Sequence, residues 1–360
     1  MLPVVSVYTI FMAVVIHWLG KDQKRMFVGK HYDKTNGNGV SVIIPFRNEV
    51  NNIQGIIDSI ELQNNTNLNI EFVFVDDHSE DHTSEYIKEK TPTGYDVSVI
   101  LSDGEGKKAA LLTGIKNAKY EIVLTIDADC TFERDSIYCM YDEFVRYDLN
   151  LLCGPIRLSG NSDFEKSQAI ESAVLVAISS VFLNHRKPAT CNGANLMYKK
   201  SLFFELGAFD HKGWHASGDD DLLMQKFAQY NMKKVMYVLN SECMVTTKAC
   251  PDLKSFMDQR LRWLSKRKAY IYSYNRYLHL LFLLKTLFLV LLPLELFLSF
   301  HQTFYLLCCI LLSDLLLFMK LRDKFKLKFT PLFFIYQFYP VLLLFKLGRT
   351  SIIWKGREIR

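Results

Sequence analysis

Short apolar runs that end in acidic residues are the feature that most constrains the fold of this chain. Two such runs lead directly into aspartates: Phe72–Val75 into Asp76-Asp77, and Ile122–Ile126 into Asp127-Ala128-Asp129. Brief runs rich in β-branched and aromatic residues are typical of buried strands. Because open α/β sheets bind ligands outside the carboxyl ends of their strands, the aspartates predict a polar site along one edge of a sheet.

Four strands are expected before residue 130, each separated from the next by a loop or a segment with helical periodicity. They are Val40–Pro45, Glu71–Val75, Val97–Leu101 and Glu121–Ile126. Strands that alternate with helices form a mostly parallel sheet, and such a sheet is covered by helices on both faces. The expected fold of this part is therefore α/β.

The two ends of the chain are apolar enough to enter a membrane. Leu2–Leu19 and the stretches 278–300 and 302–320 each have the length that crosses about 30 Å of hydrocarbon. A further apolar stretch, 331–348, is expected to cross as well. Pro340 within it leaves a re-entrant or interfacial element as the alternative.

The charge distribution predicts an orientation. Basic clusters at 21–25 and 260–268 flank the apolar stretches, so the positive-inside rule places residues 21–277 in the cytoplasm. The net charge of +5 comes mainly from these clusters, and no basic stripe alternates with aromatic residues, which excludes nucleic acid as a partner. The eight cysteines show no CxxC pair and no metal-ligand spacing, so reduced thiols are expected.

Six motifs follow one another in the order typical of family 2 inverting glycosyltransferases, which the chain resembles over about residues 38–270. The motifs are Ser41–Glu49, Val75–Asp81, Gly106–Leu111, Asp127-Ala128-Asp129, Gly218–Asp221 and Gln259–Trp263. The last resembles the Gln-x-x-Arg-Trp motif of cellulose, chitin and hyaluronan synthases and of ceramide glucosyltransferase. The resemblance implies a GT-A-like fold, related to the Rossmann type, with transmembrane helices at both ends.

The chain is accordingly expected to divide into four parts. These are a transmembrane helix at 1–20, a catalytic domain at 38–270, a transmembrane region of two or three helices at 278–348 and a basic tail at 349–360.

The resemblance implies a nucleotide-sugar site. Its residues would be Pro45, Glu49, Asp76, Asp77, Lys107 and Asp127. Asp76 and Asp77 suit the N–H of a uracil-type base as acceptors, although an aspartate here can instead cap a helix. Lys107 would help to hold the nucleotide, and an ordinary solvated lysine is the alternative.

The resemblance also implies a metal site at Asp127 and Asp129, with Mg²⁺ or Mn²⁺ as the cofactor. Carboxylate oxygens are the ligands that hard divalent cations prefer. Such a cation would neutralise the diphosphate as it departs. Two surface aspartates without a metal are the alternative.

The cluster Asp219-Asp220-Asp221 resembles the family position of the catalytic base, and alignment on the Gly-Asp-Asp form of hyaluronan synthases assigns that role to Asp220. An inverting transfer needs one carboxylate to take the proton of the acceptor hydroxyl. Adjacent like charges raise at least one pKa in such a cluster. Asp219 and Asp221 can also be solvated residues at a helix N-terminus.

Gln259, Arg262 and Trp263 are expected at the diphosphate and the acceptor. Gln259 and Arg262 stand at i and i+3 and share one face of a helix. Arg262 suits a bidentate contact with the diphosphate, and Trp263 offers an apolar face to a sugar or lipid acceptor. An amphipathic helix lying on lipid headgroups is the alternative.

Together these expectations describe an inverting hexosyltransferase that moves a sugar from a nucleotide sugar, a UDP-sugar by the base contacts, to a lipid or glycan acceptor. It is expected to be an integral protein of the inner or plasma membrane with a cytoplasmic catalytic domain. A processive polysaccharide synthase is the alternative, but the helices after residue 277 are few for a secretion channel. A phosphatase and a non-catalytic nucleotide-sugar sensor are weaker alternatives.

Overall fold

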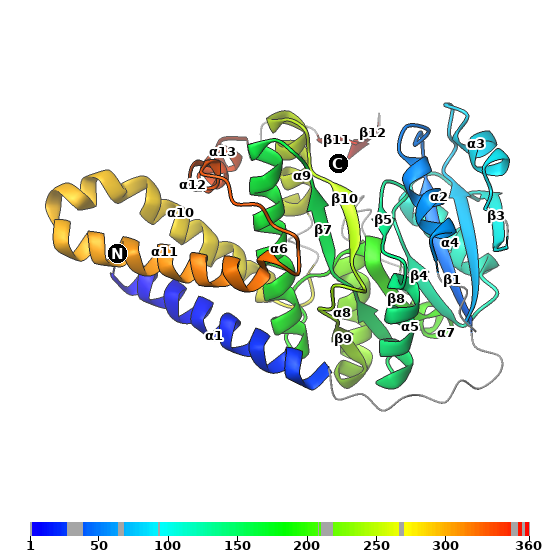
Figure 1. Ribbon diagram of the computed structural model, residues 1–360, viewed down its shortest axis with the longest axis horizontal. Coiled ribbons are helices and arrows are strands. Elements are labelled where there is room, and N and C mark those ends of the chain that lie inside the picture. The colour runs from blue at the N-terminus through cyan, green and yellow to red at the C-terminus, as the bar shows by residue number, and fades with distance from the viewer. Residues whose placement is uncertain are drawn as a thin grey trace. The chain divides into compact units, whose positions relative to one another are not determined.

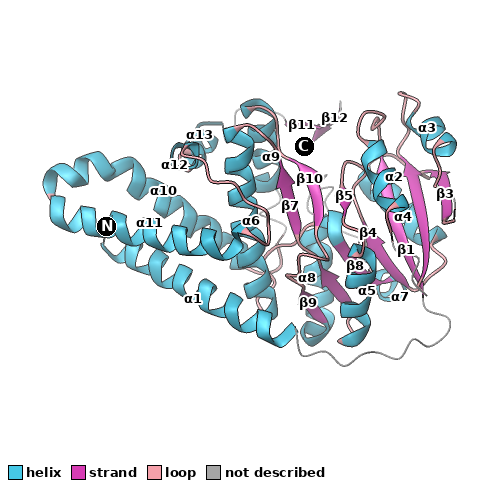
Figure 2. Cartoon of the chain, viewed as in Figure 1, coloured by secondary structure: helices cyan, strands magenta, loops and turns pink. Residues whose placement is uncertain are grey.

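A computed structural model of the protein describes residues 2–26, 39–63, 68–92, 94–207, 209, 219–265, 270–346, 352–354 and 357–359. The chain forms two compact units. The sheet unit comprises Gly29–Arg157 and Thr190–Lys248, and the helical unit comprises Met1–Val28, Leu158–Ala189 and Ala249–Arg360. Strands belong mainly to the first unit and long helices mainly to the second (Figure 2).

The sheet unit begins with alternating strands and helices. Its elements are β1 (Gly39–Phe46), α2 (Ile53–Glu61), β2 (Asn69–Asp76), α3 (Thr83–Glu89), β3 (Asp96–Leu101), α4 (Lys107–Asn117), β4 (Ile122–Thr125), β5 (Thr131–Phe132), α5 (Ser136–Arg146), β6 (Leu151–Cys153), the 3-10 turn η1 (Gly193–Asn195), β8 (Leu196–Lys199), α7 (Lys200–Glu205), α8 (Asp219–Asn231), the 3-10 turn η2 (Met232–Lys234), β9 (Val235–Tyr237) and β10 (Val245–Lys248). Strand β7 (Ile156–Ser159) leads out of this unit.

The central sheet has seven strands in the order β3-β2-β1-β4-β8-β6-β9 (Figure 1). The pairs β1–β2, β2–β3, β1–β4 and β6–β9 are parallel, whereas β8 runs antiparallel to both of its neighbours. The expected mostly parallel α/β sheet is therefore confirmed. The four strands expected from the sequence are β1 to β4, and their ends agree with the expected ones to within two residues.

Burial explains why these segments form strands. All eight residues of β1 are buried, as are the last six of β2, so both strands are covered on both faces. Helix α4 packs closely on one face, because a Cβ at Gly114 would stand 2.5 Å from a methyl group of Ile43. Right-handed crossovers with this strand order put α2 and α3 on the opposite face.

The strand order reverses between β1 and β4. After β1 the chain adds β2 and then β3 on one side of it, and β4 then pairs with the other side of β1. In open α/β sheets ligands bind at this switch point, outside the carboxyl ends of the two strands. The segments that follow β1 and β4 therefore mark the expected site.

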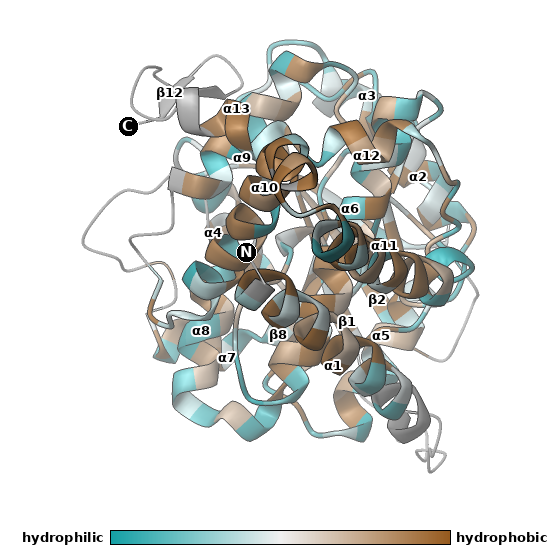
Figure 3. Ribbon diagram, turned by 90° about the vertical axis from the view of Figure 1, so that its left-hand side faces the viewer, coloured by the Kyte–Doolittle hydropathy of each residue, from teal (hydrophilic) through white to brown (hydrophobic). Residues whose placement is uncertain are grey.

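The helical unit is built from segments far apart in the sequence. Its elements are α1 (Leu2–Met26), α6 (Asp163–Asn184), α9 (Leu253–Ser265), α10 (Tyr274–Leu298), α11 (Phe300–Arg322), α12 (Leu332–Tyr336), α13 (Tyr339–Lys346) and the short strands β11 (Ile352–Trp354) and β12 (Arg357–Ile359). Helices α1, α10 and α11 pack side by side, and hydrophobic residues run along all three (Figure 3).

Four of the described helices are long and apolar enough to cross a membrane. Three correspond to the stretches expected from the sequence: Pro3–Lys21, Tyr274–Leu294 and Phe300–Arg322. The fourth, Asp163–Asn184, was not expected, and 61% of its apolar window is buried inside the protein.

The expected crossing at 331–348 stays a prediction, and residues 347 and 348 lie outside the described part of the chain. Its described residues form α12 and α13, helices of five and eight residues. At 1.5 Å per residue neither helix reaches across about 30 Å of hydrocarbon. Pro340 stands in the first turn of α13, where a proline is tolerated because that backbone N–H has no helical partner. The break into two helices fits the interfacial alternative.

Candidate active site

Charged side chains converge at the switch point of the sheet. The Nζ atom of Lys107, at the start of α4, lies 2.5 Å from Oδ1 of Asp127, which follows β4. The charges of Asp220 and Asp129 also act on Lys107. We call Lys107, Asp127, Asp129 and Asp220 the charged cluster. Three expected roles, namely nucleotide contact, metal ligand and base, thus fall in one place.

The backbone before α4 fixes the position of Lys107. Gly106 has a φ of +93°, a conformation that glycine adopts without strain, and it precedes the first helical residue. Its N–H donates to Oδ1 of Asp77 at 2.6 Å. Burial would lower the pKa of Lys107, but Asp127, and then Asp220 and Asp129, raise it above its usual value. The ammonium therefore stays charged within the cluster.

Asp129 has an environment that disfavours its ionised form. Its side chain reaches the surface, yet the carboxyl group is partly enclosed. Burial, and then the negative charges of Asp127 and Glu49, raise the pKa of Asp129 above its ordinary range, with Lys107 acting in the opposite direction. Repulsion among these carboxylates would be relieved by a cation.

The donor set fits a hard divalent cation. Asp127 and Asp129 supply carboxylate oxygens, the ligands that Mg²⁺ and Mn²⁺ prefer. Among the residues that the structure describes, no three His, Cys, Asp or Glu side chains form a complete metal site. Mg²⁺ sites commonly take one or two carboxylates together with substrate phosphates. Asp127 and Asp129 therefore suit a cation that binds with its phosphate ligand.

Asp76 and Asp77 stand at the end of β2, and both are nearly inaccessible to solvent. Oδ1 of Asp76 accepts a bond from the N–H of Ser79 at 2.8 Å, and Oδ2 accepts one from the hydroxyl of Ser84. These contacts shape the loop before α3. Asp77 instead holds the loop before α4 through Gly106. Both carboxylates keep further acceptor capacity, since an ionised carboxylate has about four lone-pair sites.

Two other expected nucleotide residues lie at the carboxyl end of β1. Pro45 is a buried residue of β1, opposite Val75 of β2. Glu49 follows the strand, and its Oε2 accepts a bond from the amide of Asn52 at 2.8 Å. The charge of Glu49 acts on Asp129, so the segment after β1 adjoins the charged cluster.

The aspartate triplet begins α8, and its members have different environments. Oδ2 of Asp220 accepts a bond from the N–H of Gly193 at 3.1 Å, and Oδ1 accepts one from the N–H of Asp221 at 2.8 Å. Asp221 is completely buried, and its Oδ1 accepts bonds from the hydroxyl of Thr190 at 2.7 Å and the N–H of Cys191 at 2.8 Å. The side chain of Asp219 lies outside the described residues. Asp221 is thus an anchor for a loop, and Asp220 is the member of the described pair that solvent can reach.

The loop 190–195, for which the sequence predicts no definite role, contacts Asp220 of the charged cluster. Besides the bonds to Asp220 and Asp221, the carbonyl of Gly193 accepts a bond from the hydroxyl of Thr125 at 2.6 Å, at the end of β4. Asn195 is fully buried and donates to the carbonyls of Pro155 and Cys243, each at 2.9 Å. The loop therefore ties β4 to α8. Asp220 owes its position to this loop.

The motif Gln259–Trp263 lies on α9 in the helical unit, and its buried arginine is one that the sequence analysis did not single out. Arg260 is 4% exposed, whereas Gln259, Arg262 and Trp263 are half-buried. The guanidinium of Arg260 lies 4.3 Å from the ring centroid of Trp263 and donates to Oε1 of Gln259 at 3.2 Å. Arg260 therefore fixes two of the three expected residues.

Arg260 is itself held by an ion pair with α6. Its Nη2 lies 2.5 Å from Oε2 of Glu171, and the hydroxyls of Tyr336 and Tyr339 also donate to that carboxylate. Phe256, one turn before Arg260, packs against both tyrosines. The spacing of the motif does not predict this network, because Glu171, Tyr336 and Tyr339 come from distant segments of the chain.

The expectation that all eight cysteines are reduced is wrong for two of them. Cys139 of α5 and Cys243, between β9 and β10, form a disulfide with their Cα atoms 5.4 Å apart. The other six are thiols. Disulfides persist in oxidising compartments and are rare in the cytosol. A cytoplasmic location of the sheet unit is therefore a proposal that the state of this pair can test.

Comparison with known proteins identifies the family of the central part of the chain. Residues 41–207 match the model of glycosyl transferase family 2. The chain is 31% identical over 144 residues to the poly-beta-1,6-N-acetyl-D-glucosamine synthase of Staphylococcus aureus, a match that covers 39% of this chain and 35% of that protein. It is 32% identical over 115 residues to the glycosyltransferase GlyA of Streptococcus pneumoniae, covering 32% of this chain and 16% of that one. The chain thus spans about a third or less of the length of these relatives.

A solved structure shares the fold over nearly the whole chain. The mannosyltransferase PcManGT of Pyrobaculum calidifontis, in complex with GDP-Man and Mn²⁺, is 18% identical, with a TM-score of 0.53 over 95% of this chain and 98% of that one. The fold is thus GT-A-like. Residues 41–207 thus form a glycosyl transferase family 2 domain, in a chain whose fold is that of GT-A glycosyltransferases.

Proposed function

We propose that the chain transfers a sugar, with inversion, from a nucleotide sugar to an acceptor held at a membrane. The observation that carries the proposal is the ion pair of Lys107 and Asp127 at the switch point of the sheet, with Asp129 and Asp220 close by. A cation-binding carboxylate pair, a phosphate-binding lysine and a candidate base are the groups that such a transfer requires.

The donor would bind along the carboxyl ends of β2 and β4. The N-terminus of α4 and the ammonium of Lys107 suit the two phosphates, because helix N-termini and lysines both bind anions. Asp76 and Asp77 suit the N–H of a uracil-type base, and for this reason a UDP-sugar is proposed. Asp127 and Asp129 would hold Mg²⁺ or Mn²⁺, which when bound neutralises charge on the departing diphosphate.

Asp220 would act as the base. Its carboxylate takes the proton of the acceptor hydroxyl while the hydroxyl oxygen forms a bond to the anomeric carbon. The bond from that carbon to the diphosphate oxygen breaks, and the nucleoside diphosphate leaves with its electron pair. The N–H groups of Gly193 and Asp221 orient the carboxylate for this role.

The acceptor is proposed to be a lipid or a glycan associated with the membrane. Four helices of membrane-spanning length support the location, and Gln259, Arg262 and Trp263 on α9 are proposed to contact the diphosphate and the acceptor. The preferred reaction is a single transfer at the cytoplasmic face of the inner or plasma membrane. Processive synthesis is the second candidate, because one relative is named a poly-beta-1,6-N-acetyl-D-glucosamine synthase.

A test of this function uses the full chain in detergent, a panel of labelled nucleotide sugars and lipid extracts as acceptors. One donor should be consumed, with release of its nucleoside diphosphate, and the product should carry a single sugar. A ladder of longer products would support the processive candidate instead. If every donor remains intact with Mg²⁺ and with Mn²⁺, the proposed function is wrong.

The metal requirement has its own test. A chelator should abolish turnover, and Mn²⁺ or Mg²⁺ should restore it. Asp129→Ala should lose turnover without a change in thermal unfolding, whereas Asp58→Ala, at an exposed aspartate of α2, should behave like the unaltered protein. Full activity of Asp129→Ala, or of the unaltered protein in chelator, would contradict the metal assignment.

A further inference from the structure

We propose that a cavity in the helical unit binds the hydrocarbon chain of a hydroxyl-bearing lipid that serves as the acceptor. That the lipid is the acceptor rests on the proposed function, whereas the presence of a lipid site is inferred from the cavity alone. The cavity measures about 720 Å³, and all of its lining residues belong to the helical unit. Its size lies within the roughly 300–1,000 Å³ typical of ligand pockets.

The wall of the cavity is mainly hydrocarbon. It is formed by α1, α6, α9, α10 and α11 and by residues between 329 and 343. Val174, Leu283, Leu315 and Phe333 are examples from four different segments. Three of the helices that form the wall, α1, α10 and α11, are of membrane-spanning length and composition, so a lipid can reach the cavity from the bilayer.

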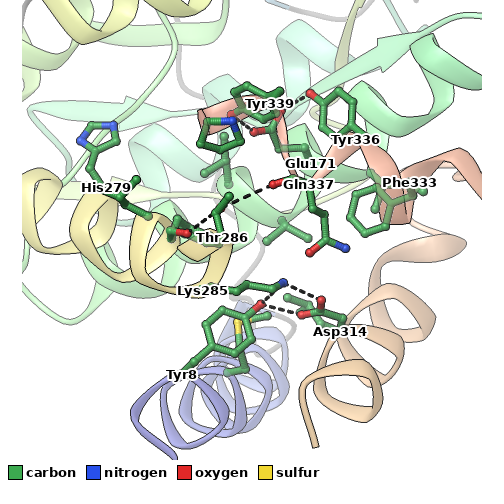
Figure 4. Close-up of a pocket in the computed structure, with 18 of the residues that line it drawn as sticks. Tyr8, Glu171, His279, Lys285, Thr286, Asp314, Phe333, Tyr336, Gln337 and Tyr339 are labelled. Carbon is green, nitrogen blue, oxygen red and sulfur yellow. Dashed lines mark hydrogen bonds and ion pairs between the residues drawn. The ribbon is translucent and has the colours of Figure 1, made fainter. Parts of the chain in front are cut away.

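The charged side chains at one end of the cavity neutralise one another. Nζ of Lys285 lies 2.6 Å from Oδ2 of Asp314 and 2.8 Å from the hydroxyl of Tyr8, which donates to Oδ1 of the same aspartate at 2.5 Å (Figure 4). These three side chains therefore leave no net charge for a phosphate or carboxylate to match. A charged lipid headgroup would lose its hydration here without gaining a partner.

The α9 end of the cavity offers a buried hydrogen-bond donor. Arg260 lines the cavity, and its Nε atom is buried without a hydrogen-bond partner, although its other nitrogens bind Glu171 and Gln259. Figure 4 shows Glu171 with Tyr336 and Tyr339 at this end, away from Lys285 and Asp314. A buried N–H without an acceptor is rare, and a hydroxyl oxygen of a ligand would satisfy it. The ion pair leaves Arg260 and Glu171 without net charge, and the exposed Arg276 lines the same cavity.

The cavity also lies on the helix that carries the expected acceptor residues. Trp263 lines it, and Gln259 and Arg262 belong to the same helix, α9. A chain held among α6, α10 and α11 would therefore have its hydroxyl end at α9. A polysaccharide fits this cavity poorly, because its hydroxyls would face leucine, phenylalanine and valine side chains without hydrogen-bond partners. The lining thus favours a single transfer to a lipid over the extrusion of a polymer.

A pair of neighbouring leucines on α11 provides a matched test. Leu315 lines the cavity and is 51% exposed, whereas Leu316 is 50% exposed and does not line it. Leu315→Trp should fill part of the cavity, and Leu316→Trp should add the same bulk outside it. Leu283→Trp is a second filling variant on α10, with Leu287→Trp, at an exposed residue outside the lining, as its control.

The probe is a long-chain fatty alcohol that carries a photoreactive diazirine, added to the full chain in detergent. Irradiation should label peptides of α6, α10 and α11. Labelling should fall about tenfold, which corresponds to 1.4 kcal/mol of binding, in Leu315→Trp and Leu283→Trp but not in their controls. Excess diacylglycerol should compete for the site, whereas chito-oligosaccharides should not. Thermal unfolding checks that all four variants are folded.

The outcomes separate the lipid site from the proposed function. Equal labelling of filling and control variants, or competition by the oligosaccharides, would overturn the inference whatever the enzyme does. Release of nucleoside diphosphate from the donor is measured in parallel. If the alcohol labels the cavity but no donor is consumed, the proposed function fails and the lipid site remains. If the donor is consumed and Leu315→Trp transfers sugar to diacylglycerol as well as Leu316→Trp does, the cavity is not the acceptor site.

Discussion

Replacing Glu171 with glutamine tests whether the buried ion pair of α6 and α9 holds the motif helix in place. The change keeps the shape of the side chain but removes the charge that faces Arg260. Arg260 is 4% exposed and would remain positively charged, because a guanidinium does not lose its proton in proteins. Removing one partner of a buried pair costs about 3–5 kcal/mol. Glu171 is 18% exposed, so the lower figure applies.

The expected loss is therefore about 3 kcal/mol in the free energy of unfolding of the helical unit, a fall in its melting temperature on the order of 10 °C. Thermal unfolding of the full chain in detergent measures it. Glu171→Gln combined with Arg260→Met should recover most of the loss, since buried ion pairs are often replaceable by apolar groups. Two results would refute the reasoning: a single variant that melts like the unaltered protein, or a double variant that melts lower than the single one.

Three further predictions concern the site and the orientation. Asp220→Asn should reduce turnover about 10²–10⁴-fold and leave nucleotide binding intact. Asp221→Ala should instead lower the free energy of unfolding by about 1–3 kcal/mol, because two buried donors lose their acceptor. Kinetics and thermal unfolding of both variants separate the two roles. Lys107→Met should raise the dissociation constant of the nucleoside diphosphate about tenfold or more, measured by calorimetry, and unchanged binding would contradict a phosphate contact. In a background without native cysteines, a cysteine at His301 should react with an impermeant maleimide in intact cells and one at Asn36 should not; the reverse would overturn the cytoplasmic orientation.

The sheet was predictable from the sequence because its strands are short runs of buried residues with a polar residue at one end. Each such run predicts a strand without information from the rest of the chain, and the four strands predicted in this way are β1 to β4. Strands β6, β8 and β9 have three or four residues and were not expected, because none of them belongs to an apolar run that ends in acidic residues. The position of Asp127 followed from topology, because it follows β4 at the switch point, whereas that of Lys107 followed from the resemblance.

The contacts that complete the site depend on packing between distant segments. Nothing in the sequence near Asp220 indicates that Gly193 binds its carboxylate or that Thr190 binds Asp221. The register of the triplet could therefore be assigned only by resemblance. Likewise α6 reads as an ordinary mixed helix, because its charged first turn and Glu171 interrupt the apolar pattern. Only the fold shows that Glu171 is neutralised by Arg260.

The disulfide between Cys139 and Cys243 has a topological consequence. Residues 158–189, which leave the sheet unit to supply α6 to the helical unit, lie between the two cysteines in the sequence. The two cysteines are 104 residues apart in the sequence, and the bond closes this stretch into a covalent ring. The ring includes the segment that runs from the sheet unit to the helical unit and back. Closing a ring of roughly 100 residues restricts the unfolded chain by about 4.7 kcal/mol in the chain-entropy model. With the bond formed, the point where the chain leaves the sheet unit after Arg157 and the point where it returns at Thr190 belong to one closed ring, which remains closed when the noncovalent contacts of the sheet unit are lost.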